Sequence, residues 1–375
     1  MPPDETYFNA STIGAQPKMV LDAVIHHLQY YAVNIAKTDW KEGGKELLTG
    51  YFPYFEIRRK LGKLKNADVN EISLTQNAHM GMNFISNGLE LNAGDEIIMT
   101  DREHVGGKCG WELMAKRKGI VIRQIEIPVP ANDPIEIIEK VESMITRRTR
   151  VIAVPHIVSA FGLILPVREI CAIARERGIF TVIDGAQAIG HIPIDVKDIG
   201  CDAYYSSPHK WLLAPAGNGA LYIRKEIVSE VWTTLASGQW DNHEDDGYRF
   251  TQRGTGNPAI LAGLEAAIDF HNTIGNEKVT GRIKFLGDRL REGLRSIKNV
   301  EILSSIHPDM CAGVTTYRIK GITGRELQDE LWKRGKLQPR AMGGDLGIRH
   351  STHIFNTVEE IDRTLAIVND LAARV

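Results

Sequence analysis

Short apolar runs alternate with amphipathic segments between about residues 70 and 225. The apolar runs are rich in β-branched residues and have the length of buried strands. They lie at 71–75, 95–100, 120–127, 150–154, 181–183 and 204–206. Between them, apolar residues recur at helical spacing around Phe84 and Ile85, over 133–141 and over 167–177, where Gly178 ends the segment. This alternation predicts an α/β fold whose sheet is mostly parallel, with helices on both faces.

The segments before this region follow a different pattern. Residues 7–14 form a short extended start, and Pro17 then opens a helix that runs to about His27. Residues 56–64 predict another helix. Between these helices, residues 32–55 show only weak periodicity, so we expect an irregular segment there.

After Lys225 the regular alternation ends. Helical patterns lie at 259–273, 282–298, 324–334 and 358–375, and strand patterns lie at 300–303 and 312–319. This mixture predicts a smaller α+β domain at the C-terminal end. We therefore expect a large domain over 15–258 and a small domain formed by 1–14 together with 259–375.

The composition is that of an ordinary globular protein. Of the 375 residues, 43% are hydrophobic and 25% are charged, and the net charge is -2. We expect no nucleic-acid partner from this charge, and no membrane span or signal peptide, because neither a long apolar run nor a leader pattern is present. The scattered cysteines are Cys109, Cys171, Cys201 and Cys311. They form no CxxC pair, so we expect reduced thiols, a cytoplasmic location and no metal site.

The candidate chemistry centres on Asp184 and Lys210. The strand at 181–183 delivers Asp184 to its carboxyl end, and Lys210 follows the strand at 204–206. Open α/β sheets bind ligands at this edge. A lysine can hold pyridoxal phosphate (PLP) as a Schiff base, and a carboxylate on the pyridine nitrogen keeps the ring an electron sink. Either residue alone would be interpreted as a surface residue, but the pair predicts a PLP site.

The residues around this pair resemble a known family. Asp-Gly-Ala-Gln at 184–187, Ser-Pro-His-Lys-Trp at 207–211 and the Gly-rich run at 214–219 are similar to the cofactor segment of fold-type I PLP enzymes. Within that fold type, they resemble the class V aminotransferase and cysteine desulfurase group, and most closely its isopenicillin N epimerase-like branch. The resemblance implies a large PLP-binding domain and a smaller C-terminal domain.

The resemblance assigns a role to each residue of this segment. Lys210 would bind PLP and move the Cα proton of the substrate, and Asp184 would pair with the pyridine nitrogen. Gln187 would lie near the ring hydroxyl, and Ser207 and His209 would contact the phosphate.

A second phosphate-binding segment follows the strand at 71–75. Small polar residues lead there from the strand into a helix, and the free N–H groups of a helix N-terminus bind anions. Asn77, Ala78 and His79 also resemble the phosphate loop of the family, with Thr75 behind them.

His104 follows the strand at 95–100, where the family carries the residue that stacks on the PLP ring. Without the resemblance it would be a surface histidine in a loop. A histidine at this place resembles the desulfurase and C–S lyase members, because aminotransferases usually carry a larger aromatic residue. Ser159 would hydrogen-bond near the ring oxygen.

The substrate end of the site is predicted from two distant segments. Residues 348–357 resemble the Arg-x-Ser-x-His-x-Tyr-Asn-Thr segment of the family, and Arg349 would clamp the α-carboxylate through its planar fork of donors. Asn9, Ser11 and Thr12 would line the substrate pocket by the same resemblance. For each of these three, a plain strand or helix cap is an equal alternative.

Thr255 bears on the oligomeric state. Gly254 and Thr255 resemble the segment that, in this group, reaches the phosphate of the other subunit. The resemblance therefore implies a homodimer with shared active sites.

The loop before Arg349 bears on the reaction. Cysteine desulfurases need a mobile cysteine in this loop, and residues 338–347 contain none, while Cys311 lies at the start of an expected strand. Together with His104, this favours a C–S β-lyase that acts on a cysteine-derived amino acid without a protein persulfide. Aminotransferase and amino-acid epimerase chemistry remain alternatives.

A non-catalytic descendant that binds PLP or a partner is a different class of function. Loss of the lysine, the ring aspartate or the carboxylate arginine would favour it. Lys210, Asp184 and Arg349 are all present, so we expect an enzyme whose small-molecule substrate is an amino acid.

Overall fold

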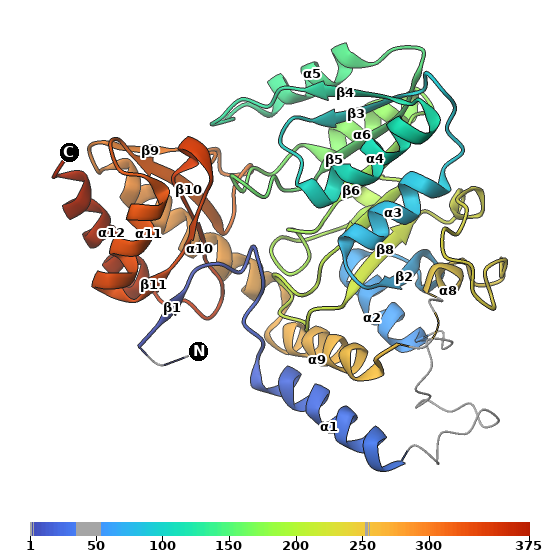
Figure 1. Cartoon of the computed structure of the whole chain (residues 1–375), viewed down its shortest axis with the longest axis horizontal. Helices are drawn as coiled ribbons and strands as arrows, with labels where there is room; N and C mark the ends of the chain where they lie inside the picture. The colour runs from blue at the N-terminus through green and yellow to red at the C-terminus, as the bar shows by residue number, and fades with distance from the viewer. Residues whose placement is uncertain (1, 3, 35–53, 252–253, 255) are drawn as a thin grey trace.

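The computed structural model describes residues 2, 4–34, 54–251, 254 and 256–375. Most of the segment expected to be irregular (32–55) lies outside these residues, and so does Thr255. No helix within the described ranges is long and apolar enough to cross a membrane. Figure 1 shows a larger body formed by the middle of the chain and a smaller body formed by its C-terminal part.

The larger body is built on a seven-stranded sheet in the order β2-β8-β7-β6-β5-β3-β4. Its strands are β2 (Ile72–Thr75), β3 (Glu96–Thr100), β4 (Val121–Ile125), β5 (Thr149–Pro155), β6 (Phe180–Asp184), β7 (Ala203–Ser206) and β8 (Gly219–Ile223). Neighbouring strands are parallel except at β8, which is antiparallel to β2 and β7. The predicted mostly parallel sheet is confirmed, and the carboxyl ends of the six strands other than β8 lie at one edge.

Helices cover both faces of this sheet. One face packs against α2 (Phe55–Lys65), α5 (Pro134–Met144), α6 (Val167–Glu176) and α9 (Pro258–Ile274), and the other against α3 (Ala78–Gly88), α4 (Val105–Lys118) and α8 (Asp246–Thr251). In β6, Ile183 belongs to the first of these cores and Val182 to the second. Burial on both faces is why this strand has no apolar–polar alternation.

The smaller body contains a four-stranded antiparallel sheet in the order β12-β13-β10-β9. Its elements are β9 (Val300–Ile302), β10 (Val314–Ile319), β12 (Arg340–Ala341), β13 (Ile348–Ser351), α10 (Asn276–Arg295), α11 (Gly324–Gly335) and α12 (Val358–Ala372). The N-terminal strand β1 (Thr6–Tyr7) pairs in parallel with β11 (Leu337–Gln338). The chain start therefore joins the smaller body before α1 (Lys18–Asn34) packs against α9 of the larger one (Figure 1).

Short elements complete the connections: α7 (Val196–Ile199) links β6 to β7, and single-turn helices occur at η2 (Val69–Glu71), η3 (Val228–Glu230) and η4 (Gly344–Leu346).

The packing of α9 suggests a refined domain boundary. Leu261, Leu264 and Ile268 of this helix belong to the core of the large sheet. We therefore propose that the boundary between the domains lies between α9 and α10, and not at residue 258 as the sequence suggested.

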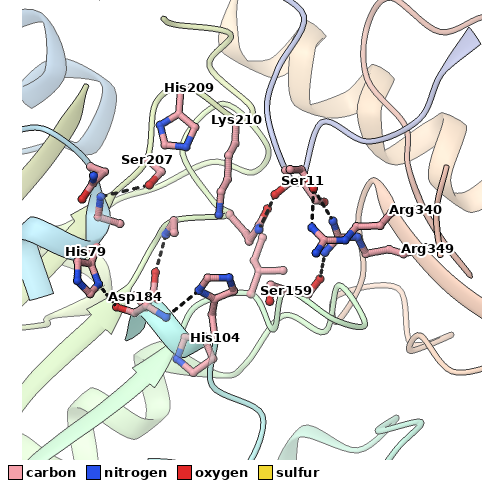
Figure 2. Close-up of a pocket in the computed structure, with 18 of the residues that line it drawn as sticks. Ser11, His79, His104, Ser159, Asp184, Ser207, His209, Lys210, Arg340 and Arg349 are labelled. Atoms are coloured by element: carbon pink, nitrogen blue, oxygen red, sulfur yellow. Dashed lines mark hydrogen bonds between the residues drawn. The ribbon is translucent and has the colours of Figure 1, made fainter. Parts of the chain in front are cut away.

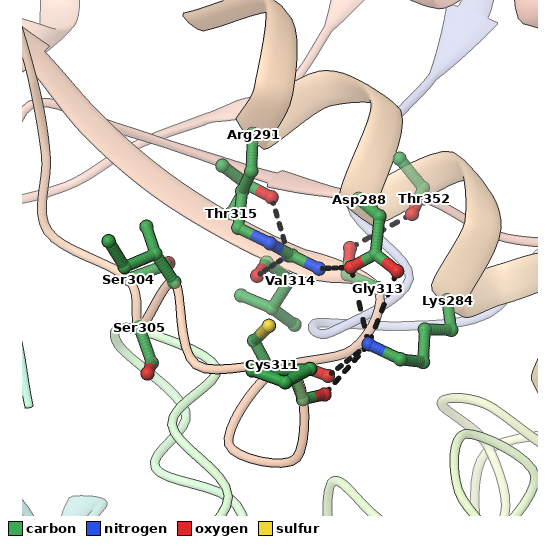
Figure 3. Close-up of polar contacts among 12 residues, drawn as sticks. Lys284, Asp288, Arg291, Ser304, Ser305, Cys311, Gly313, Val314, Thr315 and Thr352 are labelled. Carbon is green, nitrogen blue, oxygen red and sulfur yellow. Dashed lines mark hydrogen bonds and ion pairs between the residues drawn. The ribbon is translucent and has the colours of Figure 1, made fainter. Parts of the chain in front are cut away.

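Buried polar contacts fix α10 to the beginning of β10 (Figure 3). Arg291 is 3% exposed, and it donates hydrogen bonds to Val314 O at 3.1 Å and to Thr315 Oγ1 at 3.0 Å. Lys284 donates to Pro308 O at 2.8 Å. Cys311 is held in this region, where its Sγ donates to His307 O at 3.2 Å. This buried cysteine therefore lies in the loop that precedes β10, and not at the start of the strand as the sequence suggested.

Several elements were missing from the sequence prediction, among them α4, β8, β12 and β13. α4 begins directly after His104, where several glycines weaken the helical pattern, and β8 begins at the last glycine of the Gly-rich run at 214–219. α10 also begins six residues before the predicted 282.

Candidate active site

A cavity of about 330 Å³ opens at the carboxyl edge of the large sheet. The N-terminal segment and the β12–β13 region close its other side. The predicted residues that line it are Ser11, Thr12, Asn77, Ala78, His79, His104, Ser159, Asp184, Gln187, Ser207, His209, Lys210 and Arg349. Of the remaining predicted residues, Asn9 does not line the cavity but is hydrogen-bonded to Arg349, and Thr255 is outside the described part of the chain.

Asp184 and Lys210 meet in this cavity, as the sequence predicts (Figure 2). Asp184 ends β6 and is 8% exposed, and its Oδ1 accepts a hydrogen bond from the Ala186 N–H at 2.8 Å. Burial raises the pKa of Asp184, while the Ala186 N–H and the charge of Lys210 lower it. Burial lowers the pKa of Lys210 to about 8, against the attraction of Asp184. An acid and a readily deprotonated amine therefore share one buried space.

An anion site lies where β2 leads into α3. Asn77 caps this helix, since its Oδ1 accepts a hydrogen bond from the Met80 N–H at 2.9 Å. The Ala78 N–H donates to Ser207 Oγ at 3.2 Å, which joins the helix N-terminus to the loop after β7. Asn77, Ala78 and His79 line the cavity at this helix N-terminus, which is the kind of place where an anion can bind.

The same end of the cavity is shaped by β8 and by histidines. Gly219 has no room for a side chain, because a Cβ atom there would lie 2.3 Å from Thr75 Oγ1. His79 and His209 line the wall. Burial and the charge of Lys210 lower the pKa of His209.

His104 has a defined protonation state. It is the N-cap of α4, and its Nδ1 accepts a hydrogen bond from the Gly106 N–H at 3.0 Å. A nitrogen that accepts cannot carry a proton, so the ring proton lies on Nε2. Partial burial and the charges of Lys210, Arg340 and Arg349 lower the pKa of His104, so the ring is neutral at neutral pH. Figure 2 shows His104 and Lys210 entering the cavity from opposite sides.

Gln187 lines the cavity and connects it to the N-terminal segment. Its Nε2 donates to Ser11 O at 3.0 Å, and its Oε1 accepts from Trp211 Nε1 at 2.8 Å. The indole of Trp211 stacks on His191 with ring centroids 3.6 Å apart. The side-chain amide of Gln187 is therefore held firmly and keeps one further N–H group for a ligand.

Arg349 and Arg340 line the end of the cavity where the sequence predicts that the substrate binds, and this end is called the substrate end below (Figure 2). Arg349 donates to Ser159 O at 2.7 Å, and to Asn9 Oδ1 and Thr12 Oγ1, each at 3.2 Å. Arg340 donates to the same Thr12 hydroxyl at 2.9 Å. Thr12 therefore links the two guanidinium groups, while Asn9 orients Arg349 by accepting a hydrogen bond from it.

This end carries uncompensated positive charge. Among the described residues, no carboxylate forms an ion pair with Arg340 or Arg349. Arg349 is 4% exposed, and its Nε has no hydrogen-bond partner in the described structure. Burial and the charge of Arg340 lower the pKa of Arg349 to about 10. A buried cation without a counter-ion is costly, so an anionic ligand beside Arg349 would relieve this arrangement.

The residues present fit pyridoxal phosphate. The buried Asp184 suits the ring nitrogen, Lys210 reaches into the same cavity, and the first turn of α3 offers N–H groups to the phosphate. The orphaned Nε of Arg349 marks the place of a further anion, which a substrate carboxylate can supply.

Comparison with known protein families identifies the same class of protein. Residues 6–364 match the family described as Aminotransferase class-V, and the chain belongs to this family. It is therefore a PLP-dependent enzyme, which confirms the fold, the cofactor and the enzymatic nature expected from the sequence.

Two kinds of relative are similar over almost the whole chain. The isopenicillin N epimerase of Amycolatopsis lactamdurans is 30% identical over 99% of this chain and 96% of its own. A probable cysteine desulfurase of Pyrococcus abyssi is 28% identical, over 97% of this chain and 94% of its own.

Solved structures agree with this fold. A complex of the cystine C–S lyase C-DES with its product cysteine persulfide has a TM-score of 0.86 at 26% identity, and the match covers 98% of both chains. The apo cysteine desulfurase of Thermococcus onnurineus has a TM-score of 0.85 at 25% identity, over 99% of this chain and 95% of its own.

The sequence prediction missed several residues of the cavity wall, above all Arg340 and Met342. Both lie in the loop at 338–347, whose lack of a cysteine was the feature used in the sequence analysis. The signal that could have found Arg340 is a cation in this loop, close in sequence to Arg349.

Proposed function

We propose that the protein is a C–S β-lyase that acts on a cysteine-derived amino acid with a second anionic group, without a protein persulfide. The observation that carries this proposal is His104, a neutral ring with its proton on Nε2, opposite Lys210 in a positively charged cavity. The likeness to the cystine C–S lyase supports it.

PLP, when bound, withdraws electrons from the Cα atom of the amino acid. Lys210 acts as the base at Cα. With a pKa near 8, its Nζ holds a proton loosely at neutral pH and can take one from a carbon acid and return it. Asp184 keeps a negative charge next to the ring nitrogen.

His104 supports the sulfur as it leaves. β-Elimination breaks the Cβ–S bond, and a hydrogen-bond donor stabilises the negative charge that develops on the departing thiolate. The neutral Nε2–H group of His104 can donate that hydrogen bond and keep its proton, while the Gly106 N–H holds the ring in place through Nδ1. The hydrogen bond to Gly106 thus fixes both the tautomer and the direction of the donor.

The arginines select the substrate. Arg349 suits the α-carboxylate, because it is buried and held in place by Ser159 and Asn9. Arg340 stands on the other side of Thr12 and suits an anionic group at the far end of the substrate. A cysteine disulfide or thioether with a second carboxylate has this chemistry.

The wall offers no thiol for sulfur transfer. Of the cavity-lining residues described, none is a cysteine, and Met342 stands in the loop where desulfurases need one. All described cysteines are free, with Cys171, Cys201 and Cys311 buried. The sulfur should therefore leave as a small molecule, and free cysteines fit a proposed cytoplasmic location.

The deciding assay incubates the holoenzyme with a panel of cysteine disulfides and thioethers, half of which carry a second carboxylate. We expect pyruvate, ammonia and a free thiol or persulfide in equal amounts, and no sulfur on the protein by mass spectrometry. Conversion of the cofactor to its amine form without pyruvate would show transamination instead.

Amino-acid epimerisation is the second candidate, because isopenicillin N epimerases are 30% and 32% identical to this chain. Lys210 can carry a proton on one side of the cavity, and epimerisation needs a second proton carrier on the opposite side. Deuterium uptake at Cα with racemisation and no pyruvate would decide for the epimerase.

We also propose a homodimer with shared sites. The outer face of α1 exposes Leu21, Ile25 and Leu28, each by more than 40%, and such a face suits an interface. Mixing inactive Lys210→Ala and Thr255→Ala chains should restore some activity if Thr255 acts across the interface. Proven subunit exchange without recovery would remove Thr255 from this role.

A further inference from the structure

A second carboxyl group, on the partly buried Glu103, lies near Asp184, and the chemistry above does not use it. Glu103 immediately precedes His104 and follows β3. Its Oε1 accepts hydrogen bonds from Thr100, at 3.1 Å from the backbone N–H and at 2.8 Å from Oγ1. These bonds fix one carboxyl oxygen at the end of the strand and leave Oε2 for contacts deeper in the protein.

Gly107 brings the acids together. A Cβ atom on Gly107 would lie 2.9 Å from Asp184 Oδ2 and 3.6 Å from Glu103 Oε2, with Tyr205 Oη at 3.8 Å. Because residue 107 has no side chain, both carboxyl groups border the same small space. Two carboxylates that border one such space repel each other, so ionising both is costly.

The groups around Glu103 decide which acid holds the proton. Those that face it are Asp184 from β6, Asp101 from its own loop and Tyr205 from β7, and none of them is a cation. By contrast, the positive charge of Lys210 lowers the pKa of Asp184 and so favours its ionised form. Burial, opposed by the Thr100 hydrogen bonds and reinforced by the charge of Asp184, raises the pKa of Glu103 to about 8. Burial also raises the pKa of Tyr205, so its phenol stays protonated.

We propose that Glu103 is a positioning residue that stays protonated in the working enzyme, so that Asp184 is the single negative charge beside the ring nitrogen of the cofactor. The proposal rests on the assignment of Asp184 to that nitrogen. When Glu103 loses its proton in alkaline solution, a second negative charge arises beside Asp184. Repulsion then acts between β6 and the start of α4, where His104 is held.

The first test uses the apo protein and needs no turnover. Infrared difference spectra between about pH 6 and 10 should show a protonated carboxyl group that disappears with a midpoint near 8. The band should be absent in Glu103→Gln, which keeps the acceptor for Thr100, and present in the neighbouring control Asp101→Asn. A wild-type spectrum without the band, or a band that Glu103→Gln retains, would overturn the proposal.

The second test follows the cofactor. The rate of PLP loss on dialysis should rise about tenfold between pH 6.5 and 9.5 in the wild type, because a tenfold change corresponds to a shift of one pKa unit between the PLP-bound and PLP-free forms. The rise should be smaller in Glu103→Gln. Equal pH dependence in both proteins would overturn the link from Glu103 to the cofactor. Should Glu103→Gln fail to fold, Glu103→Asp keeps the acid but withdraws it from Gly107. We then expect the infrared midpoint to fall, and an unchanged midpoint would contradict the proposal.

A parallel measurement on Asp184→Asn separates this inference from the proposed function. A cofactor absorption spectrum and pH response equal to the wild type would show that Asp184 does not hold the ring nitrogen. That result would overturn the assignment on which the proposal rests, even if the infrared band behaves as expected.

Discussion

The cofactor end and the substrate end of the cavity are built in different ways. Asp184, Ser207 and the start of α3 follow strand ends of one sheet, and hydrogen bonds within the protein hold them. Arg340, Arg349 and Thr12 come from segments far apart in sequence and meet where the smaller body closes the cavity. The cofactor end is a feature of the large sheet, whereas the substrate end depends on the placement of the smaller body.

The two ends of the cavity also differ in how well their charges are balanced. At the cofactor end, Asp184 and Lys210 partly balance each other. At the substrate end, Arg340 raises the positive potential around Arg349. Among the described residues, no carboxylate forms an ion pair with either arginine. The cofactor end is thus nearly complete, while the substrate end needs its ligand. Substitutions at the cofactor end should affect all substrates, and those at the substrate end should discriminate among them.

The largest expected effect is at Lys210. Lys210→Ala removes both the attachment of PLP and the base at Cα, so turnover should fall at least about 10⁴-fold for every substrate. Borohydride should fix the cofactor to the peptide around residue 210 in the wild type and not in the variant. A variant that still carries borohydride-fixed cofactor on this peptide would contradict the assignment of Lys210.

Arg349 should come second. Arg349→Gln removes the buried partner of the α-carboxylate, and loss of such a partner costs about 2–5 kcal/mol. We expect kcat/KM to fall about 100-fold or more for all amino-acid substrates. Arg318→Gln is the matched control, because Arg318 is an arginine of the smaller body that pairs with Glu301 away from the cavity. Equal losses in both variants would point to stability in place of binding.

Arg340 should separate substrates. A partly exposed ion pair contributes roughly 1 kcal/mol, so Arg340→Gln should lower kcat/KM about fivefold for substrates with a second anionic group. Substrates without that group should be unaffected. A uniform loss would show that Arg340 acts through Thr12 on Arg349 and does not contact the substrate itself.

The sequence predicted the cofactor end more fully than the substrate end, for a physical reason. Strand ends of a parallel sheet share one edge, so Asp184 and Lys210 could be placed together from the alternation of strands and helices alone. Arg349 was found only through a resemblance, and Arg340 was missed, because the antiparallel pairing of β12 with β13 is not evident from so short a strand. The tautomer of His104 depends on α4, which the glycines at its start concealed.

The last expected effect concerns the stability of the apo protein and not turnover. Burial lowers the folded pKa of Lys210 to about 8 from its ordinary 10.5. Between these pH values the unfolded chain binds more protons than the folded one, so the stability of the wild type should rise with pH across this window. Lys210→Met should remove this dependence and should be more stable than the wild type below pH 8, by roughly 1–3 kcal/mol. The advantage should shrink as the pH approaches 10.5, because the wild-type amine is then neutral in both states. Urea unfolding of both apo proteins at a series of pH values measures it. If the unfolding free energies of the two proteins changed with pH in parallel, the Lys210 amine would be well solvated. The cofactor end would then contain no buried amine.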